Sequence, residues 1–287
     1  MLRTNRERLV MVSVMGQVSA PGVRAPYRVG YDGVARVGPA TGGITYNVRV
    51  GDPALGWVGD HVEPGVSTKD PDETANAGYN TLACVGNRAY VVSGEAKGAT
   101  GVVTGKHGGI EHVLIDFAPD ILEKMAIGDK IQVRAYGQGL ELLDFPGVRV
   151  MNLDPGLLDR MGIEAVDGRL RVPVVGVVPP ELMGSGLGSP TAERGDYDLT
   201  TQDRAALKEA GLGGVRLGDI VAIRDHSSFY GRSYQRGAVI IGVVIHGDSN
   251  ISGHGPGVTS LLTSRDGSIE PVIVPAANIA TYLGLRR

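Results

Sequence analysis

Six histidines are the residues of this sequence best suited to chemistry, because none of them lies in the middle of an apolar run. Five of the six have Gly or Asp within two positions, which indicates strand ends and turns, where rigid scaffolds display functional groups. A histidine in a turn is usually only a solvated polar residue, so a site requires several of them together. The six are His61, His107, His112, His226, His246 and His254.

The densest group follows a strongly apolar run that ends at Ile245. His246, Asp248 and His254 fall on one Gly-rich loop. Two imidazoles and a carboxylate are the ligand set of an open catalytic metal site, and neighbouring glycines let backbone and ligand approach closely. We therefore expect these three side chains to hold a divalent metal ion, for which zinc is a candidate. Their spacing matches no specific metal-binding motif.

A second polar group lies about 20 residues earlier in the sequence, at the turn between two apolar runs. Here Asp225 or His226 could transfer protons, Arg232 could orient an anionic group, and Tyr230 could line the substrate site. In a simple antiparallel hairpin, strands rising ~3.3 Å per residue would separate this turn from His246 by about 20 Å. The two groups are then distinct, unless the strands bend, pair elsewhere or meet across a subunit interface. The alternative is an ordinary turn capped by the Asp.

A third candidate combines the single cysteine with a histidine. If two strands flank a turn at residues 94–100, His107 lies opposite Gly86, two residues from Cys84. An imidazole beside a thiol can activate it as a nucleophile, which would give a metal-free enzyme. The alternative, which is more common for a lone Cys, is a small buried hydrophobic residue.

The elements that must position these residues are mostly short strands. Val- and Ile-rich runs recur between clusters of Gly, Pro, Asn and Asp, and only a few segments carry helical signals. This pattern predicts a mainly β protein with barrel- or sandwich-like domains and a few short helices. The expected strands are 9–14, 89–92, 101–104, 112–116, 130–135, 171–178, 219–223, 238–245, 258–263 and 270–274; the expected helices are 119–125, 154–161, 200–210 and 275–283.

The 287 residues suffice for two domains. The Gly- and Ser-rich segment 184–195 has the most linker-like composition, so we expect an N-terminal β-rich domain at 1–183 and a C-terminal β-rich part at 184–287, packed on the first. The histidine- and aspartate-bearing loops of residues 225–254 belong to the second part.

Composition excludes several classes of protein. The 28 basic and 31 acidic side chains leave a net charge of −3 with no basic stripe, so a nucleic-acid partner is not expected. No run approaches the ~20 apolar residues of a membrane span. One cysteine excludes intrachain disulfides and fits a reducing compartment. We expect a cytoplasmic protein that acts on a small molecule, and we expect a homo-oligomer.

Three resemblances add to this interpretation. Residues 91–103 resemble the KOW motif of ribosomal and transcription-factor barrels, which implies a barrel hairpin at 89–105, with RNA binding as an extra. The runs 105–117, 219–232 and 245–257 together resemble DUF4438, a prokaryotic family of unknown function with N- and C-terminal parts; this implies a β-rich cytoplasmic protein and no activity. A looser likeness, in style alone, is to acetamidase/formamidase-type amidases, which set His and Asp among glycines near a metal.

Together these features favour a metal-assisted hydrolase of a small polar substrate, and the amidase likeness suggests an amide or cyclic amide C–N bond. An ion at His246, Asp248 and His254 would supply hydroxide near neutral pH. The alternatives are the metal-free enzyme of Cys84 and His107, or a non-catalytic β-barrel that binds a small molecule or RNA.

Overall fold

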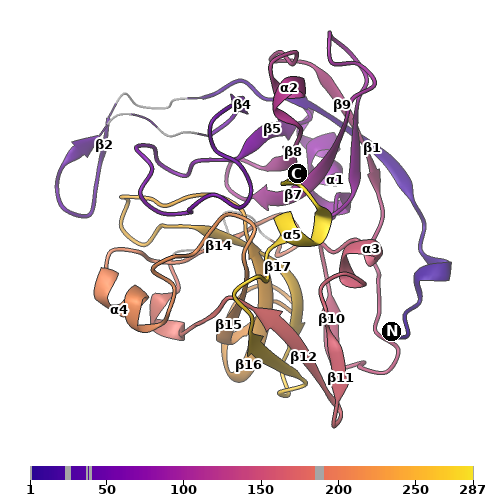
Figure 1. Ribbon diagram of the computed structural model, residues 1–287, viewed down its shortest axis with the longest axis vertical. Helices are drawn as coiled ribbons and strands as arrows, with labels where there is room; N and C mark the ends of the chain where they lie inside the picture. Colours follow the sequence, from indigo (N-terminus) through magenta and orange to yellow (C-terminus); the bar gives the residue numbers. More distant parts are fainter. Residues whose placement is uncertain (1, 23–26, 37, 39–40, 185–190, 287) are drawn as a thin grey trace.

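A computed structural model describes residues 2–22, 27–36, 38, 41–184 and 191–286. It confirms a mainly β architecture with a few short helices. Figure 1 shows two β-rich units, the N-terminal one in purple above the C-terminal one in orange and yellow. Half of the Gly-rich segment 184–195 that suggested a linker, residues 185–190, lies outside the described residues. No helix in the described part of the chain is both long and apolar enough to cross a membrane.

The N-terminal unit is a closed barrel of six antiparallel strands. Alternation of apolar and polar residues along a strand puts one set of side chains inside, as Ile131 and Val133 show on β9. Because the last strand also pairs with the first, the barrel leaves no open edge. Its strands, in order around the barrel, are β1 (Val12–Val18), β9 (Lys130–Ala135), β6 (Arg88–Val91), β7 (Thr100–His107), β8 (His112–Asp116) and β5 (Gly65–Lys69), with β4 (Ile44–Thr45) beside β5.

The C-terminal unit is built on a second sheet. Its centre is the long hairpin of β15 and β16, which a β-bulge bends at Asp225. The strands are β10 (Val148–Val150), β17 (Gly257–Ser264), β16 (Ser233–Val244), β15 (Ile220–Ser227) and β13 (Gly176–Val178), with β14 (Tyr197–Asp198) beside β17. Two small sheets complete the fold: β11 (Glu164–Val166), β12 (Arg169–Val174) and β18 (Ile269–Ile273), and the projecting pair β2 (Arg28–Val29) and β3 (Ala35–Arg36).

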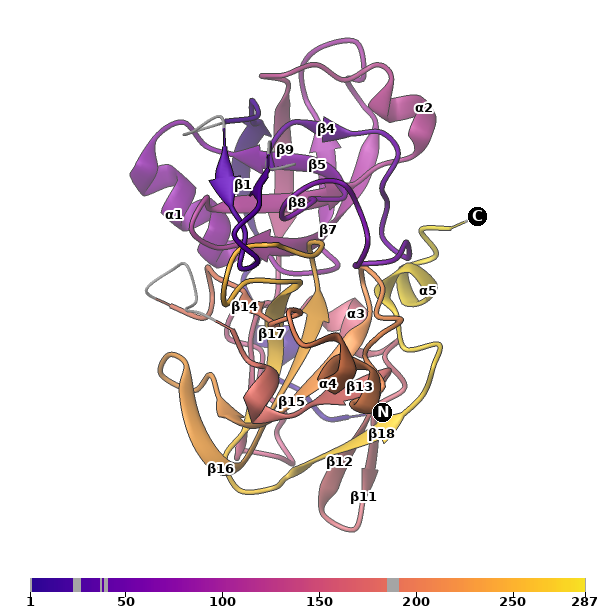
Figure 2. The ribbon, with the colours of Figure 1, turned by 90° about the vertical axis from the view of Figure 1, so that its left-hand side faces the viewer.

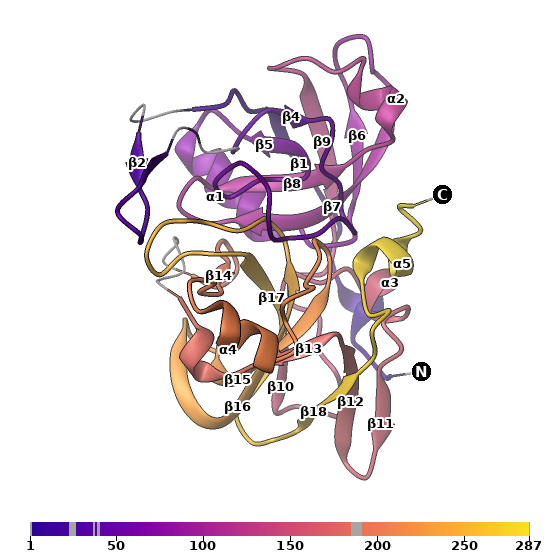
Figure 3. The same ribbon diagram turned by 60° about the vertical axis from the view of Figure 1, so that its left-hand side comes forward.

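The helices are short, and four of the five α-helices in the described residues begin at a side-chain cap. Asp72, Asp154, Asp203 and Asn278 each accept a hydrogen bond from a backbone N–H in the first turn of a helix. The α-helices are α1 (Glu73–Leu82), α2 (Pro119–Leu122), α3 (Pro155–Leu158), α4 (Arg204–Glu209) and α5 (Ile279–Leu283); Arg6–Arg8 and Pro180–Leu182 are 3-10 turns. Helix α5 lies at the side of the junction between the two units (Figure 3).

The chain passes from the barrel to the C-terminal sheets earlier in the sequence than the linker-like composition of residues 184–195 suggested. Strands β10 to β13 precede residue 183, yet they pair within the C-terminal sheets. The chain therefore leaves the barrel between Ala135 and Val148, ahead of the expected boundary at 183/184. This difference arises because strand pairing, rather than glycine content, defines the unit.

The hairpin of β6 and β7 is present, but its register differs from the expected one. Arg88 pairs with Val102, and the ladder ends at the bond from Val103 to Asn87. β7 pairs with β8 from Val102 onward, with a bulge between Val103 and Gly105, and His107 pairs with His112. The expectation that His107 lies opposite Gly86 was wrong, because the turn between β6 and β7 sets a different register and the β6–β7 ladder ends before His107.

The two units pack directly on each other where β7 meets β17. The backbone N–H of Lys106 donates to Thr259 Oγ1 at 3.2 Å, and the Thr259 hydroxyl donates to Lys106 O at 3.1 Å. Gly105 lies against Ile245 with no room for a Cβ atom. Figure 2 shows β7 and β17 adjacent at this junction. The close approach brings the end of β7 beside the loop that follows β16.

Candidate metal centre

Six side chains converge at the junction of the two units; we call them the His/Asp cluster. Within the cluster, metal-ligating atoms of His61, His107 and His246 all lie within 4.8 Å of one another, and two further triplets that share these residues meet the same condition. The histidine ring centroids are 4.2 Å apart for His107 and His246, and 4.9 Å for His61 and His246. The cluster comprises His61, His107, Asp196, Asp198, His246 and His254.

Buried carboxylates orient two of these imidazoles from behind. Glu63 Oε1 accepts from His107 Nδ1 at 2.6 Å, and Asp60 Oδ2 lies 3.0 Å from His61 Nδ1. Each contact leaves Nε2 as the nitrogen available to the cluster. A carboxylate behind a histidine, which fixes the tautomer and raises the basicity of the ring, is the usual outer shell of a metal-bound histidine.

Backbone geometry also holds His61 in an unusual position. Its φ is +55°, in the left-handed region that a residue with a Cβ rarely adopts, and its N–H donates to Asp248 O at 3.0 Å. Such strain costs on the order of 1–3 kcal/mol and is concentrated at functional sites. The loop between β4 and β5 therefore adopts a strained backbone conformation at His61, and this conformation places the ring against the C-terminal unit.

His246 and Asp196 face each other without forming a regular hydrogen bond. His246 Nδ1 lies 2.9 Å from Gly247 O, which favours a proton on Nδ1. Its Nε2 approaches Asp196 Oδ2 to 2.9 Å, yet both atoms are buried and neither has hydrogen-bond geometry with a partner in the described part of the chain. A proton on Nε2, or a cation bound to both atoms, would satisfy this buried pair.

Asp198 links the two sides of the cluster. Its Oδ2 lies 2.6 Å from His254 Nδ1, and its Oδ1 lies 3.6 Å from His246 Nε2. His254 Nδ1 is in turn 3.3 Å from His61 Nε2. The side chain of His254 is 38% exposed, whereas that of His246 is fully buried. The cluster therefore opens to solvent on the His254 side.

Neighbouring charges in and around the cluster shift the pKa values of its buried histidines and carboxylates. Burial acts to lower the pKa of His246, but Asp196 and Asp198 outweigh it and raise that pKa well above its usual value. Burial, together with the charge on His246, lowers the pKa of His107. Burial acts to raise the pKa of Glu63, yet His112 and His107 hold it well below its usual value. Glu63 is thus ionised and attracts positive charge.

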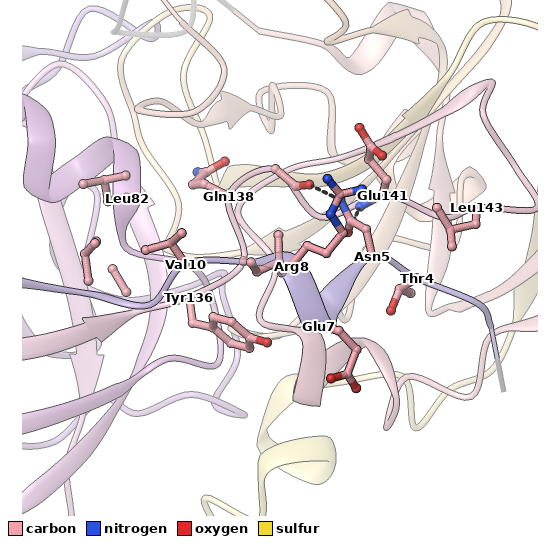
Figure 4. Close-up of a pocket in the computed structure, with 15 residues that line it drawn as sticks. Thr4, Asn5, Glu7, Arg8, Val10, Leu82, Tyr136, Gln138, Glu141 and Leu143 are labelled. Carbon is pink, nitrogen blue, oxygen red and sulfur yellow. Dashed lines mark hydrogen bonds between the residues drawn. The ribbon is translucent and has the colours of Figure 1, made fainter.

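Two cavities lie on the surface around this core. One of about 440 Å³ is lined by Arg28, Trp57, Asp60 and Ile251, among others. It adjoins the cluster, because Asp60 contacts His61 and Ile251 O accepts from the N–H of His254. The other, of about 770 Å³, lies beside the N-terminal segment, where Asn5 bonds to the 139–141 loop (Figure 4). Only the first offers a place for a substrate beside the histidines.

Of the three expected metal ligands, His246, Asp248 and His254, the structure brings two into the cluster. His246 and His254 both belong to the cluster, whereas the side chain of Asp248 does not. Asp248 forms an ion pair with Arg204 at 2.5 Å and accepts from the Thr201 hydroxyl. Because its side chain turns toward α4, Asp248 supports the loop, and the carboxylates of the cluster come from β14 instead.

The Asp225–His226 group lies apart from the cluster, as the hairpin geometry predicted. Pairing of Ile220 with Val243 puts Asp225 and His226 at the far end from His246. Asp225 sits at the bulge with φ +55° and accepts from the N–H of Gly237. His226 contacts the Tyr197 ring at a centroid distance of 6.0 Å. Neither side chain is placed to transfer protons at the cluster.

The expected substrate-binding residues lie apart from each other: Arg232 is near the cluster, and Tyr230 is on the surface. The Arg232 guanidinium lies over the Tyr197 ring, 3.5 Å from its centroid, and donates to Gly184 O at 2.8 Å. Burial lowers the pKa of Arg232, against the attraction of Tyr197, Asp198 and Asp196. Tyr230 is 85% exposed and lies under Arg265. Arg232 thus approaches the cluster from behind β14, and Tyr230 lies on the surface.

Cys84 and His107 have different partners. Burial raises the pKa of the Cys84 thiol to about 11, against the attraction of Lys106, and Sγ donates to Leu82 O at 3.5 Å. His107 uses Nδ1 for Glu63. A thiol with a raised pKa lacks the thiolate that a nucleophile needs, which supports the alternative that Cys84 is a buried hydrophobic residue.

Three acidic residues of the site were not singled out as ligands or orienting groups from the sequence. Asp196 and Asp198 lie in the sequence Gly-Asp-Tyr-Asp, whose alternation around a short strand aims both carboxylates at one side. The role of Glu63 depends on contacts with His107 and His112 that no spacing in the sequence reveals.

Comparisons with known proteins agree with this architecture. Among curated proteins, none is detectably similar to the chain. The crystal structure of TM1086 is similar over nearly the whole length: the sequences are 48% identical, the match covers 98% of this chain and 99% of that one, and the TM-score is 0.94. The family model described as Domain of unknown function (DUF4438), N-terminal, matches residues 27–159, and the model of the C-terminal part matches residues 160–283. The chain therefore belongs to the DUF4438 family.

Proposed function

We propose that this protein is a metal-assisted hydrolase that acts on a small polar substrate, with the C–N bond of an amide or cyclic amide as the bond cleaved. The observation that carries the proposal is the convergence of His61, His107 and His246, two of them held by buried carboxylates. Neutral imidazoles oriented in this way are the ligands that a divalent ion such as zinc prefers.

The surroundings of the cluster support catalysis over a purely structural ion. A structural zinc site is closed, whereas a catalytic one keeps a position for water or substrate. Here the cluster opens at the half-exposed His254, beside the cavity of about 440 Å³. A divalent ion lowers the pKa of bound water and polarises a carbonyl oxygen.

The choice of an amide follows from likeness to amidase-type sites and from the size of the cavity. The lining includes Trp57 as an apolar wall and Arg28, which pairs with Asp60 at 2.9 Å. These groups suit a compact substrate with polar edges. A nucleic acid is disfavoured, because the chain carries a net charge of −3 and both arginines that line this cavity, Arg28 and Arg36, pair with carboxylates.

Metal analysis joined to an activity screen tests the proposal. We expect the purified protein, loaded with Zn²⁺ or Mn²⁺ and dialysed, to retain at least one ion per chain and to hydrolyse members of a panel of linear and cyclic amides. His246→Ala should lose the ion and at least ~100-fold in kcat/KM, because it removes a buried ligand. The matched control is His226→Ala, a histidine of the same unit outside the cluster, which should retain both.

Two results would overturn this assignment. One is a wild-type protein that binds no divalent ion after loading, and the other is amide hydrolysis that survives in His246→Ala. Circular dichroism of each variant separates loss of the site from loss of the fold.

A further inference from the structure

The His/Asp cluster contains more ligands than one ion uses. Four-coordinate catalytic sites take three protein ligands and leave one position open. The six residues form three overlapping triplets, in which His61, Asp198 and His246 each occur twice. An imidazole nitrogen has one lone pair and binds one ion. His61 and His246 therefore cannot each serve two ions, and the six ligands must be divided between the ions that bind.

The contacts divide the cluster into two halves. His61 Nε2 lies 3.3 Å from His254 Nδ1, which is about the edge of a tetrahedron around an ion with bonds of ~2.0–2.1 Å. On the other side, the rings of His107 and His246 are 4.2 Å apart, and Asp196 lies 2.9 Å from His246. Each half therefore holds two imidazoles close together, and the ligand nitrogens of His107 and His246 lie within 4.8 Å.

Asp198 stands between the halves and directs one oxygen to each. Oδ2 is 2.6 Å from His254 and 3.7 Å from His61, whereas Oδ1 is 3.6 Å from His246. A carboxylate whose two oxygens face different histidines has the geometry of a bridging ligand. It is 10% exposed, so solvent does not account for this orientation.

The charge of the site favours bound cations. Asp60, Glu63, Asp196 and Asp198 are four carboxylates in or directly behind the cluster, whereas Arg28 pairs with Asp60 and Arg232 approaches Asp196 and Asp198. The carboxylates outnumber the two arginines, and negative charge left without a partner in a buried site is costly.

We propose that the cluster is a dinuclear metal centre in which Asp198 bridges two divalent cations. His107 and His246, with Asp196 beside them, hold the first ion; His61 and His254 hold the second, which is the one nearer to solvent. This inference rests on the proposed function and deepens it: two ions ~3.5–4 Å apart can polarise a carbonyl and supply the attacking hydroxide from separate positions.

Titration of the metal-free full-length protein with Mn²⁺, followed by calorimetry and electron paramagnetic resonance, tests the proposal. We expect two ions per chain and the spectrum of an exchange-coupled pair. His254→Ala, at the half-exposed end of the site, should bind one ion with an uncoupled signal. Asp198→Asn should lose the coupling, because it weakens the bridge. The control His226→Ala should match the wild type.

The outcomes separate this proposal from the previous one. A wild-type chain that binds one ion, unchanged in His254→Ala, overturns the dinuclear centre and leaves the hydrolase proposal standing. A chain that binds no ion overturns both. Two ions that show no coupling in the wild type also contradict the bridging role of Asp198.

Discussion

Glu63 illustrates how a single buried carboxylate can organise a site. It contacts His107 and His112 with its oxygens, and it also accepts from the Ser67 hydroxyl at 2.5 Å and from the N–H of Gly42 at 2.6 Å. Because its two oxygens accept all these hydrogen bonds, the Glu63 carboxylate cannot rotate, and it fixes the orientation of the His107 ring. Glu63 thereby transmits the rigidity of the barrel to a ligand of the cluster.

Cys84 provides a test at the residue scale of which chemistry the molecule uses. Burial raises the pKa of its thiol to about 11, so the thiolate becomes abundant only as the pH rises toward that value. At pH 7–8 we expect iodoacetamide to modify the folded protein roughly 100-fold more slowly than a free thiol with a pKa of ~8.5. Unfolding in guanidinium should restore the ordinary rate, as mass spectrometry of timed samples would show.

A Ser233→Cys variant supplies the matched control, because Ser233 is exposed and the new thiol should be labelled promptly. Rapid labelling of Cys84 itself in the folded wild type at pH 7 would contradict this prediction and would restore Cys84 and His107 as a nucleophilic pair.

At the scale of elements, the sequence predicted strands best where polar and apolar residues alternate between clear breakers. The expected strands 112–116 and 130–135 match β8 and β9 at both ends. The expected strand 171–178 is interrupted at Val175, because β12 pairs with β18 and β13 pairs with β15. Local pattern fixes that a segment is extended, whereas its partner depends on residues far away in the chain.

The helices show the same division between local and distant information. Asp154 caps α3 and Gly284 ends α5 as expected, since caps are local. The helix expected to begin at Thr200 begins at Arg204 instead, with Asp203 as its cap, because Thr201 bonds to Asp248. Helix α1 was missed, although Asp72 caps it, since its polar composition gives little amphipathic signal.

The contact between Gly105 on β7 and Ile245 at the end of β16 predicts that a larger residue at position 105 destabilises the fold. A Cβ on Gly105 would overlap Ile245, and both are held by strands with long ladders. Gly105→Ala should therefore lower the free energy of unfolding by about 1–3 kcal/mol. Because His107 lies two residues further along β7, the variant should also bind metal more weakly. Urea titration followed by circular dichroism measures the first effect, and calorimetry the second.

Gly78→Ala is the control for this substitution. Gly78 lies in α1 with no atom within 4 Å of the added methyl group, so alanine there should be neutral or stabilising by up to ~1 kcal/mol. Equal stability of Gly78→Ala and Gly105→Ala would show that the junction yields to an added methyl group.

At the scale of the whole molecule, the site exists only because two distant parts of the chain pack together. The N-terminal family match contains His61 and His107, whereas the C-terminal match contains Asp196, Asp198, His246 and His254. Sequence motifs pointed to His246 and His254 of the second set through their Gly-rich loop. They could not join it to the first, because the bulge in β7 and the packing of β7 on β17 create the meeting point.

This division of ligands predicts that metal binding stabilises both units at once. An ion at one hundred times its dissociation constant should add about 2.7 kcal/mol to the free energy of unfolding, because it binds the folded chain alone. For a chain of this size, the melting temperature should rise by roughly 4–10 °C, in one transition that includes the barrel as well as the second unit. Chelation should reverse the rise, and His246→Ala should abolish it while His226→Ala keeps it. A calorimetric scan in which metal shifts only one of two separate transitions would show that the units do not share the ion.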